Sequence, residues 1–324
     1  MKKILSIDGG GIHGIIPAIV LTEIEKRTEK PIAALFDLLA GTSAGGIIAL
    51  GLVKPDSDGK PQYKAKDLAK LYEEDGHIIF NESLWRKIYT VNNLFEEKYM
   101  SQGIDSVLSR YFGNAYLKDV VTDVLIPSYE IEKRDAFFFK STHAKKKKNY
   151  NFLLRQIARA TSAAPTFFEP EKIYTEDKSE HFFLVDGGVF ANNPGMCAYV
   201  EAKTMFPDEK DFLVVSLGTG SRTLPISYDR AKHWGIAQWA QPILSVVFDG
   251  VGDTVDYELQ QLLPTMEKKG QQYYRFQVTL DKATDPMDNA NPQNIQTLKH
   301  YAEMIIKEQN NIITTLCQQL VKHE

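Results

Sequence analysis

The stretch LSIDGGGIHG, residues 5–14, decides the fold of the first third of the chain. Residues 3–7 predict a short buried strand, and residues 15–27 predict the helix that follows it. Between them stand three consecutive glycines, Gly9, Gly10 and Gly11. Glycine loses more backbone entropy on folding than any other residue, so this cluster indicates a sharp turn or a close approach of the backbone to another group. A strand, a glycine turn and a helix in this order favour an α/β layered fold.

The rest of the chain continues this alternation of short apolar runs and amphipathic stretches. Further strands are predicted over residues 36–40, 121–126, 135–140, 182–185, 212–217 and 273–278. Further helices are predicted over residues 45–53, in pieces over 66–112, and over 151–160, 195–204, 236–263 and 292–321. No internal repeat or low-complexity linker interrupts the 324 residues. We therefore expect one domain, with the last third wrapped onto the same sheet.

Composition and charge exclude several classes of protein. The formal net charge is −4, whereas proteins that bind nucleic acid usually carry an excess of basic residues. The charge therefore argues against a nucleic-acid-binding protein. The two cysteines, Cys197 and Cys317, have no neighbours at ligand spacing, which argues against a disulfide framework and a zinc site. The apolar run at residues 4–7 is too short for a signal peptide, and no segment approaches the roughly 18 apolar residues of a membrane span. We expect a cytoplasmic protein that can visit a membrane surface without crossing it.

The glycine segment also matches G-x-G-x-x-G, the dinucleotide-binding fingerprint, over residues 9–14. Its main-chain N–H groups would face an anion at the start of the following helix. A dinucleotide site needs an acidic residue at the end of the next strand, whereas Asp37 falls near the start of the strand predicted over 36–40. A dinucleotide-dependent oxidoreductase is therefore a weaker alternative.

A second motif, Gly41-Thr42-Ser43-Ala44-Gly45, lies between a predicted strand and a small-residue helix. This is the context of a nucleophile elbow, in which a strained turn lifts a serine hydroxyl above the sheet. Ser43 is the candidate nucleophile; the structural alternative is a serine that caps the helix. No lysine follows the glycines, which excludes a phosphate-binding P-loop. If both loops lie above adjacent parallel strands, the Gly9, Gly10 and Gly11 amides face Ser43 and form an oxyanion hole.

A serine nucleophile needs a base, and a third segment supplies one. None of the seven histidines stands in the strand-end order of an α/β-hydrolase triad. Asp186, followed by Gly187 and Gly188, ends a buried strand, where α/β enzymes place functional groups. The alternative is an aspartate that caps the next turn, with residues 191–194 as an ordinary turn.

Together, the motifs at residues 8–14, 41–45 and 186–188 resemble those of the patatin-like phospholipases, and residues 158–170 and 186–194 are similar to later stretches of that family. The resemblance covers roughly residues 4–200 and implies a three-layer α/β/α sandwich with a mainly parallel central sheet. It divides the chain into a catalytic core over 1–205 and a continuation over 206–324 packed on the same domain.

The resemblance also implies a lipid acyl hydrolase with a Ser-Asp dyad. Ser43 would attack the ester carbonyl, and Asp186 would accept its proton and later activate the deacylating water. The amides of Gly9, Gly10 and Gly11 would hold the oxyanion. The glycines that flank the three motifs are Gly14, Gly41, Gly45, Gly187 and Gly188. No metal and no cofactor are implied, and the partner is a lipid substrate, met at a membrane surface.

The chain departs from the family at His13, where the glycine loop usually carries arginine. A loop histidine is more often a structural hydrogen-bonding group than a catalytic base, which is the bolder alternative for His13. The basic run at residues 145–148 is a candidate for contact with anionic lipid, although a solvated loop tip explains it as well. A catalytically silent lipid-binding protein is a further alternative, but it would need neither Ser43 nor Asp186. The sequence carries no signal for an oligomeric state.

Overall fold

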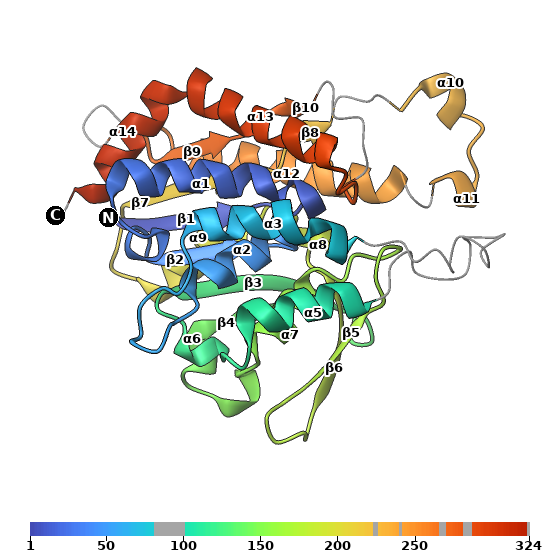
Figure 1. The fold of residues 1–324 in the computed structure, drawn as a ribbon, viewed down its shortest axis with the longest axis horizontal. Coiled ribbons are helices and arrows are strands. Elements are labelled where there is room, and N and C mark those ends of the chain that lie inside the picture. The colour runs from blue at the N-terminus through green and yellow to red at the C-terminus, as the bar shows by residue number, and fades with distance from the viewer. Residues whose placement is uncertain (81–100, 223–225, 240–241, 266–269, 281–286, 323–324) are drawn as a thin grey trace.

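A mainly parallel β-sheet forms the centre of the molecule (Figure 1). The computed structural model describes residues 1–80, 101–222, 226–239, 242–265, 270–280 and 287–322. In the described chain the sheet has eight strands in the order β5-β6-β3-β2-β1-β7-β9, and β4 also pairs with β3. The strands are β1 (Lys2–Ile7), β2 (Leu38–Gly41), β3 (Asp123–Glu130), β4 (Asp135–Lys140), β5 (Glu171–Tyr174), β6 (His181–Asp186), β7 (Phe212–Leu217) and β9 (Tyr273–Phe276).

Two groups of helices cover the two faces of this sheet. One face packs against α1 (Ile15–Thr28), α2 (Ala44–Val53), α3 (Ala65–Ile79), α5 (Ser101–Phe112), α7 (Leu154–Thr161), α13 (Pro292–Glu308) and α14 (Asn310–Val321). The other face packs against α9 (Gly195–Met205) and α12 (Pro242–Leu262). The short helices are α6 (Ser141–Ala144), α8 (Gly188–Ala191), α10 (Tyr228–Ala231) and α11 (Ile236–Trp239).

The strands at the centre are apolar on both sides because each side has its own core. In β1, Leu5 and Ile7 belong to the first core, whereas Ile4 belongs to the second. Successive side chains of a strand point to opposite faces, so a strand covered on both faces reads as one continuous apolar run. The predicted three-layer α/β/α sandwich is confirmed.

Several predicted elements differ in detail. Residues 292–321 form two helices, α13 and α14, separated at Gln309. The helix predicted over 236–263 corresponds to α11 and α12, and residues 81–100 of the predicted helical region lie outside the described residues. The prediction missed β5, in which Ile173 alone is buried, so no apolar run marks it. It also missed a pair of two-residue strands, β8 (Ser221–Arg222) and β10 (Thr279–Leu280).

Candidate active site

Ser43 stands in a tight turn between β2 and α2. Its backbone has φ 55° and ψ −123°, a strained combination for a residue with a side chain, and its side chain makes no capping hydrogen bond to the helix. Glycine is required on both sides of the turn: a Cβ on Gly41 would lie 2.1 Å from the carbonyl oxygen of Gly45, and a Cβ on Gly45 would lie 2.2 Å from that of Ile7. This geometry is that of the predicted elbow and not of a capping serine.

Side chains from other elements hold the elbow in place. The Ser43 amide donates to Thr161 Oγ1 at 3.1 Å, and the Thr161 hydroxyl donates to the Pro127 carbonyl at 2.6 Å. The Tyr72 hydroxyl donates to the Ala44 carbonyl at 2.8 Å. Sequence reasoning missed both supports. Thr161 lies within residues 158–170, which resemble the family, but nothing in the sequence around Tyr72 pointed to this contact.

The pairing of β2 and β6 with β3 brings Asp186 close to Ser43, and the sequence did not predict this arrangement. Along one edge, β3 pairs with β4; along the other edge it pairs first with β2 over residues 123–125 and then with β6 over residues 128–130. β2 and β6 therefore lie end to end along the same edge of β3, and their carboxyl ends point toward each other. Ser43 follows the carboxyl end of β2, and Asp186 is the last residue of β6. The sequence predicted Asp186 at the end of a buried strand, and β6 does end at Asp186; its antiparallel direction relative to β3 was not predicted.

The Asp186 carboxylate is almost completely buried, and its surroundings change its acidity. Burial raises its pKa to about 7, while the neighbouring Ser43 side chain and the hydrogen bond from the Gly188 amide, at 2.7 Å, act in the opposite direction. A Cβ on Gly187 would lie 2.5 Å from the Pro127 carbonyl oxygen, so the chain after Asp186 can pass β3 only without a side chain there. A carboxylate with a pKa near neutrality beside a serine hydroxyl can act as a general base.

The glycine loop offers two of its three predicted oxyanion donors. The Gly9 amide donates to the carbonyl oxygen of Asn192 at 3.0 Å, so its predicted role in the oxyanion hole requires that this bond be exchanged. The amides of Gly10 and Gly11 donate to no acceptor within the described residues, and both glycines line the same cavity as Ser43. The amide of Ala44, which the prediction missed, is the first of α2 and has no partner inside the helix. The rule that the residue after the nucleophile contributes an amide could have identified it.

Residues from the last third of the chain make hydrogen bonds and an ion pair with the glycine loop. Thr219 donates its hydroxyl to the Gly9 carbonyl at 2.7 Å, and the Ile12 amide donates to the Met287 carbonyl at 2.8 Å. At the start of the loop, the Arg275 guanidinium on β9 forms an ion pair with Asp8 at 2.7 Å. The position of the loop therefore depends on residues for which the sequence predicted no role.

His13 and Asp37 lie away from the cavity lining. His13 is buried in a 3-10 turn over Gly11–Gly14, and its side chain is not part of the cavity wall, which argues against a catalytic base. Gly14 faces the Tyr72 ring, where a Cβ would lie 2.8 Å from Cζ. Asp37 accepts from the Lys3 amide at 2.8 Å beside the amino end of β2, as the argument against a dinucleotide site required.

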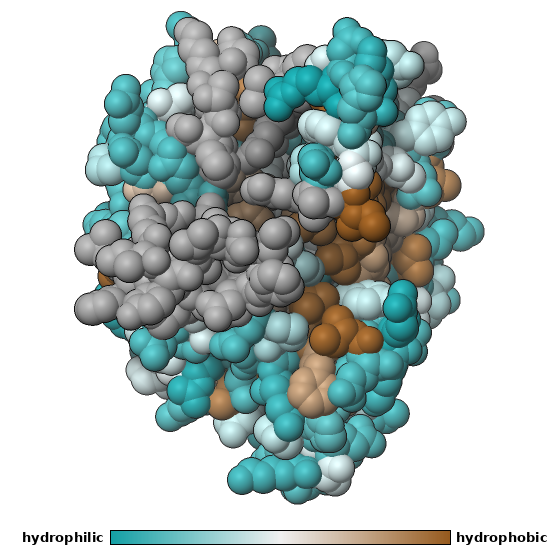
Figure 2. All heavy atoms as spheres, turned by 90° about the vertical axis from the view of Figure 1, so that its right-hand side faces the viewer, coloured by the Kyte–Doolittle hydropathy of each residue, from teal (hydrophilic) through white to brown (hydrophobic). Residues whose placement is uncertain are grey.

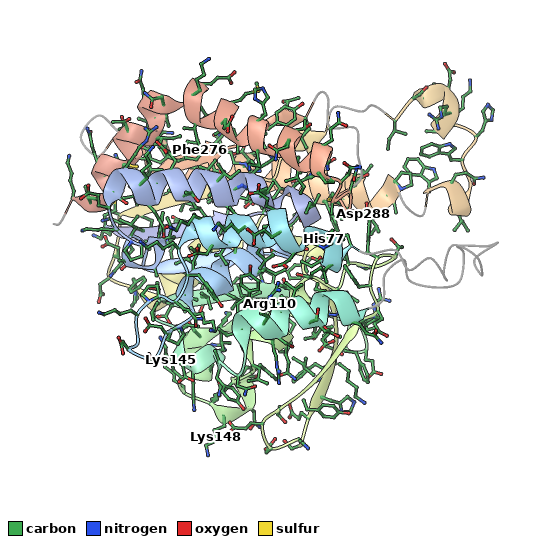
Figure 3. The ribbon with its side chains drawn as sticks, in the orientation of Figure 1. His77, Arg110, Lys145, Lys148, Phe276 and Asp288 are labelled. Carbon is green, nitrogen blue, oxygen red and sulfur yellow. The ribbon has the colours of Figure 1, made fainter. Side chains whose placement is uncertain are left out.

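A cavity of about 370 Å³ opens above Ser43 and Asp186. Most of its wall is apolar, including Ile104, Phe167, Phe168, Leu244 and Phe248. Asp186, Arg230 and Asp288 are the charged side chains among its described lining, and Figure 3 shows Asp288 at the right-hand end of the molecule. No group of three or more His, Cys, Asp or Glu side chains suited to a metal ion occurs in the described part of the chain.

Comparison with known proteins gives a consistent set of similarities. A family model for patatin-like phospholipases matches residues 5–198. Patatin-like protein 4 of Arabidopsis thaliana is 33% identical, with 94% of this chain and 83% of that protein covered. "Probable inactive patatin-like protein 9" of the same plant is also 33% identical, over 79% of this chain and 70% of its own length. Among solved structures, VipD from Legionella pneumophila aligns over 95% of this chain and 67% of its own, with a TM-score of 0.39 and 12% identity.

Proposed function

This chain belongs to the patatin-like phospholipase family, and from that premise we propose that it hydrolyses the carboxylic esters of phospholipids or related lipids with a Ser43–Asp186 dyad. The observation that supports this proposal most directly is that the Ser43 side chain lies close enough to the buried Asp186 carboxylate to lower its pKa, and that both residues line one largely apolar cavity. One similar protein is named inactive, so the family alone does not carry the proposal. The proposal rests on the positions of the Ser43 and Asp186 side chains.

The first half of the reaction forms an acyl-enzyme. Asp186 accepts the proton of the Ser43 hydroxyl while Ser43 Oγ attacks the ester carbonyl carbon. The negative charge that develops on the carbonyl oxygen is stabilised by the amides of Gly10, Gly11 and Ala44, which need no reorganisation because the loops already hold them. When the tetrahedral intermediate collapses, protonated Asp186 returns the proton to the departing alcohol, and the acyl group remains on Ser43.

The second half releases the fatty acid. Asp186 now takes a proton from a water molecule, which attacks the acyl carbonyl and forms a second tetrahedral intermediate. Its collapse breaks the bond to Ser43 Oγ, which recovers its proton from Asp186. A carboxyl group with a pKa of about 7 suits both roles, because it gives and takes a proton readily near neutral pH.

Fatty acid release from mixed phospholipid vesicles, with a chelator present, is the primary test. We expect the wild-type protein to release fatty acid, and the released species to identify the lipid class and acyl position. A fluorophosphonate probe should label Ser43 in the same preparation. Labelling without release from any phospholipid would contradict the substrate class, whereas the absence of both would contradict the dyad and favour a silent lipid-binding protein.

The rate of ester hydrolysis should depend on pH through the ionisation of Asp186. Only the ionised Asp186 can accept the serine proton, so we expect kcat/KM for a soluble short-chain ester to rise about tenfold per pH unit below pH 7 and to level off above it. Glu171 is a matched control, because burial raises its pKa to about 7 as well, although it lies outside the cavity lining. Glu171→Gln should keep the profile, and a wild-type rate that is flat between pH 5 and 9 would refute the assignment of Asp186.

A further inference from the structure

Exposed apolar side chains gather along one short segment of the chain. Of the twelve large hydrophobic residues that are exposed in the described chain, five fall between residues 226 and 246. Tyr228 is 78% exposed and Ile236 is 93% exposed, which is unusual for side chains of this size. The other three are Ile226, Ile243 and Val246. This segment carries α10, α11 and the start of α12, at the right-hand end of the molecule in Figure 1.

The same segment forms part of the cavity wall. Ile226, Arg230, Trp234, Leu244 and Phe248 line the cavity that contains Ser43. The exposed apolar residues are their near neighbours in sequence, and Ile226 is itself both exposed and part of the cavity wall. Figure 2, which faces this end of the molecule, shows brown side chains gathered beside atoms of uncertain placement.

The chemistry of the segment suits a lipid bilayer more than a charged partner. Its Asp, Arg and Lys side chains are Asp229, Arg230 and Lys232, and it has one histidine, His233. Asp229 and Lys232 pair with each other at 2.8 Å. Trp234 and Trp239 pack edge to face with ring centroids 5.2 Å apart. Tryptophan and tyrosine prefer the boundary between lipid headgroups and acyl chains, because one part of each ring system is apolar and the other forms hydrogen bonds.

The basic run at residues 145–148 lies elsewhere. Lys145 forms an ion pair with Asp123, the first residue of β3, at 2.7 Å. Asp123 pairs with Leu38, the first residue of β2, whereas Ser43 follows the last residue of β2. Asp123 and Ser43 therefore lie at opposite ends of these parallel strands. Figure 3 shows Lys145 and Lys148 at the lower left of the molecule, far from Asp288 at the cavity. A membrane held by this run would not face the cavity.

We propose that residues 226–239 and 242–248, here called the docking segment, bind the surface of a phospholipid bilayer and present the cavity mouth to it. Tyr228, Ile236, Ile243 and Val246 enter the apolar boundary of the bilayer, and the acyl chain of one lipid passes along the cavity wall toward Ser43. The inference rests on the proposed function for its choice of ligand. No helix of the described chain is long and apolar enough to cross a membrane, so the contact is with one surface.

Binding to vesicles of neutral phosphatidylcholine, measured by sedimentation, tests the proposal. The Ser43→Ala variant is used throughout, so the lipid stays intact and the result is independent of hydrolysis. We expect Tyr228→Asp and Ile236→Asp each to weaken binding about tenfold, because each replaces an inserted apolar group by a charge. Ile312→Asp is the matched control: Ile312 is 42% exposed on α14, at the other end of the molecule, and its replacement should leave binding unchanged.

Fluorescence gives a second readout that a change in folding cannot imitate. The chain has three tryptophans, so Trp85→Phe leaves Trp234 and Trp239 as the reporters. Their emission should shift to shorter wavelength on vesicles and be quenched by brominated acyl chains. Equal loss of binding in Ile312→Asp, no quenching, or binding that requires anionic lipid and vanishes when Lys145–Lys148 become glutamine would overturn the proposal. So would self-association through the docking segment without any vesicle binding.

The two proposals fail separately. If vesicles bind as expected but the wild type releases no fatty acid, the docking surface stands and the hydrolase assignment fails. If the wild type cleaves a soluble ester while no phosphatidylcholine vesicle binds, the hydrolase stands and the docking surface fails. In the active protein, Ile236→Asp should lower the ratio of vesicle hydrolysis to soluble-ester hydrolysis about tenfold.

Discussion

The Asp186→Asn variant should be at least about 10³-fold less active than the wild type and more stable at pH 8. The loss follows because an amide cannot accept the Ser43 proton, and comparable changes at a catalytic carboxylate have effects of this size. The gain follows because a buried charge is costly. The pKa of Asp186 is raised from 3.8 to about 7 on folding. Ionisation therefore destabilises the folded chain by about 4 kcal/mol above pH 7.

The sign of this effect can be checked against pH. Between about pH 4 and pH 7 the folded chain holds a proton on Asp186 that the unfolded chain has released, so wild-type stability from this group falls as the pH rises. Asparagine stays neutral, so the free energy of unfolding in urea should differ little at pH 4 and most at pH 8. Asp177→Asn is the control: Asp177 is exposed with a pKa lowered to about 2, and its replacement should bring no such gain. An Asp186→Asn variant that is less stable at pH 8 would contradict a costly buried charge.

Replacing Ser43 by alanine should lower hydrolysis by at least about 10⁴-fold, because the proposed acyl-enzyme forms on its hydroxyl. The double variant Ser43→Ala/Asp186→Asn should be no less active than Ser43→Ala alone, since residues that act as one unit are not additive. The measurement is steady-state hydrolysis of a soluble ester, combined with fluorophosphonate labelling and mass spectrometry.

Ser245 provides the matched control for this substitution. It also lines the cavity, but its hydroxyl donates to the Pro242 carbonyl at 2.8 Å within α12. Ser245→Ala should keep the label, whereas Ser43→Ala should lose it. If the two single variants at Ser43 and Asp186 multiply in the double variant, the two side chains act independently and the dyad is disproved.

The local geometry of the site could be predicted because it depends on neighbouring residues. The turn at Ser43 needs small residues before and after it, and Gly41 and Gly45 stand there in the printed sequence. The apolar runs predicted most strands of the sheet, because a strand covered on both faces must be apolar throughout. The oxyanion-hole interpretation required β1 and β2 to be adjacent and parallel, and the structure pairs Ile4–Ile7 with Leu38–Gly41 in parallel.

What the sequence by itself determined, then, is the strand-turn-helix units and the residue types that their turns require. The tertiary structure alone decided the direction of β6, the engagement of the Gly9 amide by Asn192, and the presence of Ile226, Arg230 and Trp234 in the cavity wall. Each of these depends on a contact between segments far apart in the chain. Such contacts are set by strand pairing and packing over the whole domain, and no pattern of adjacent residues encodes them.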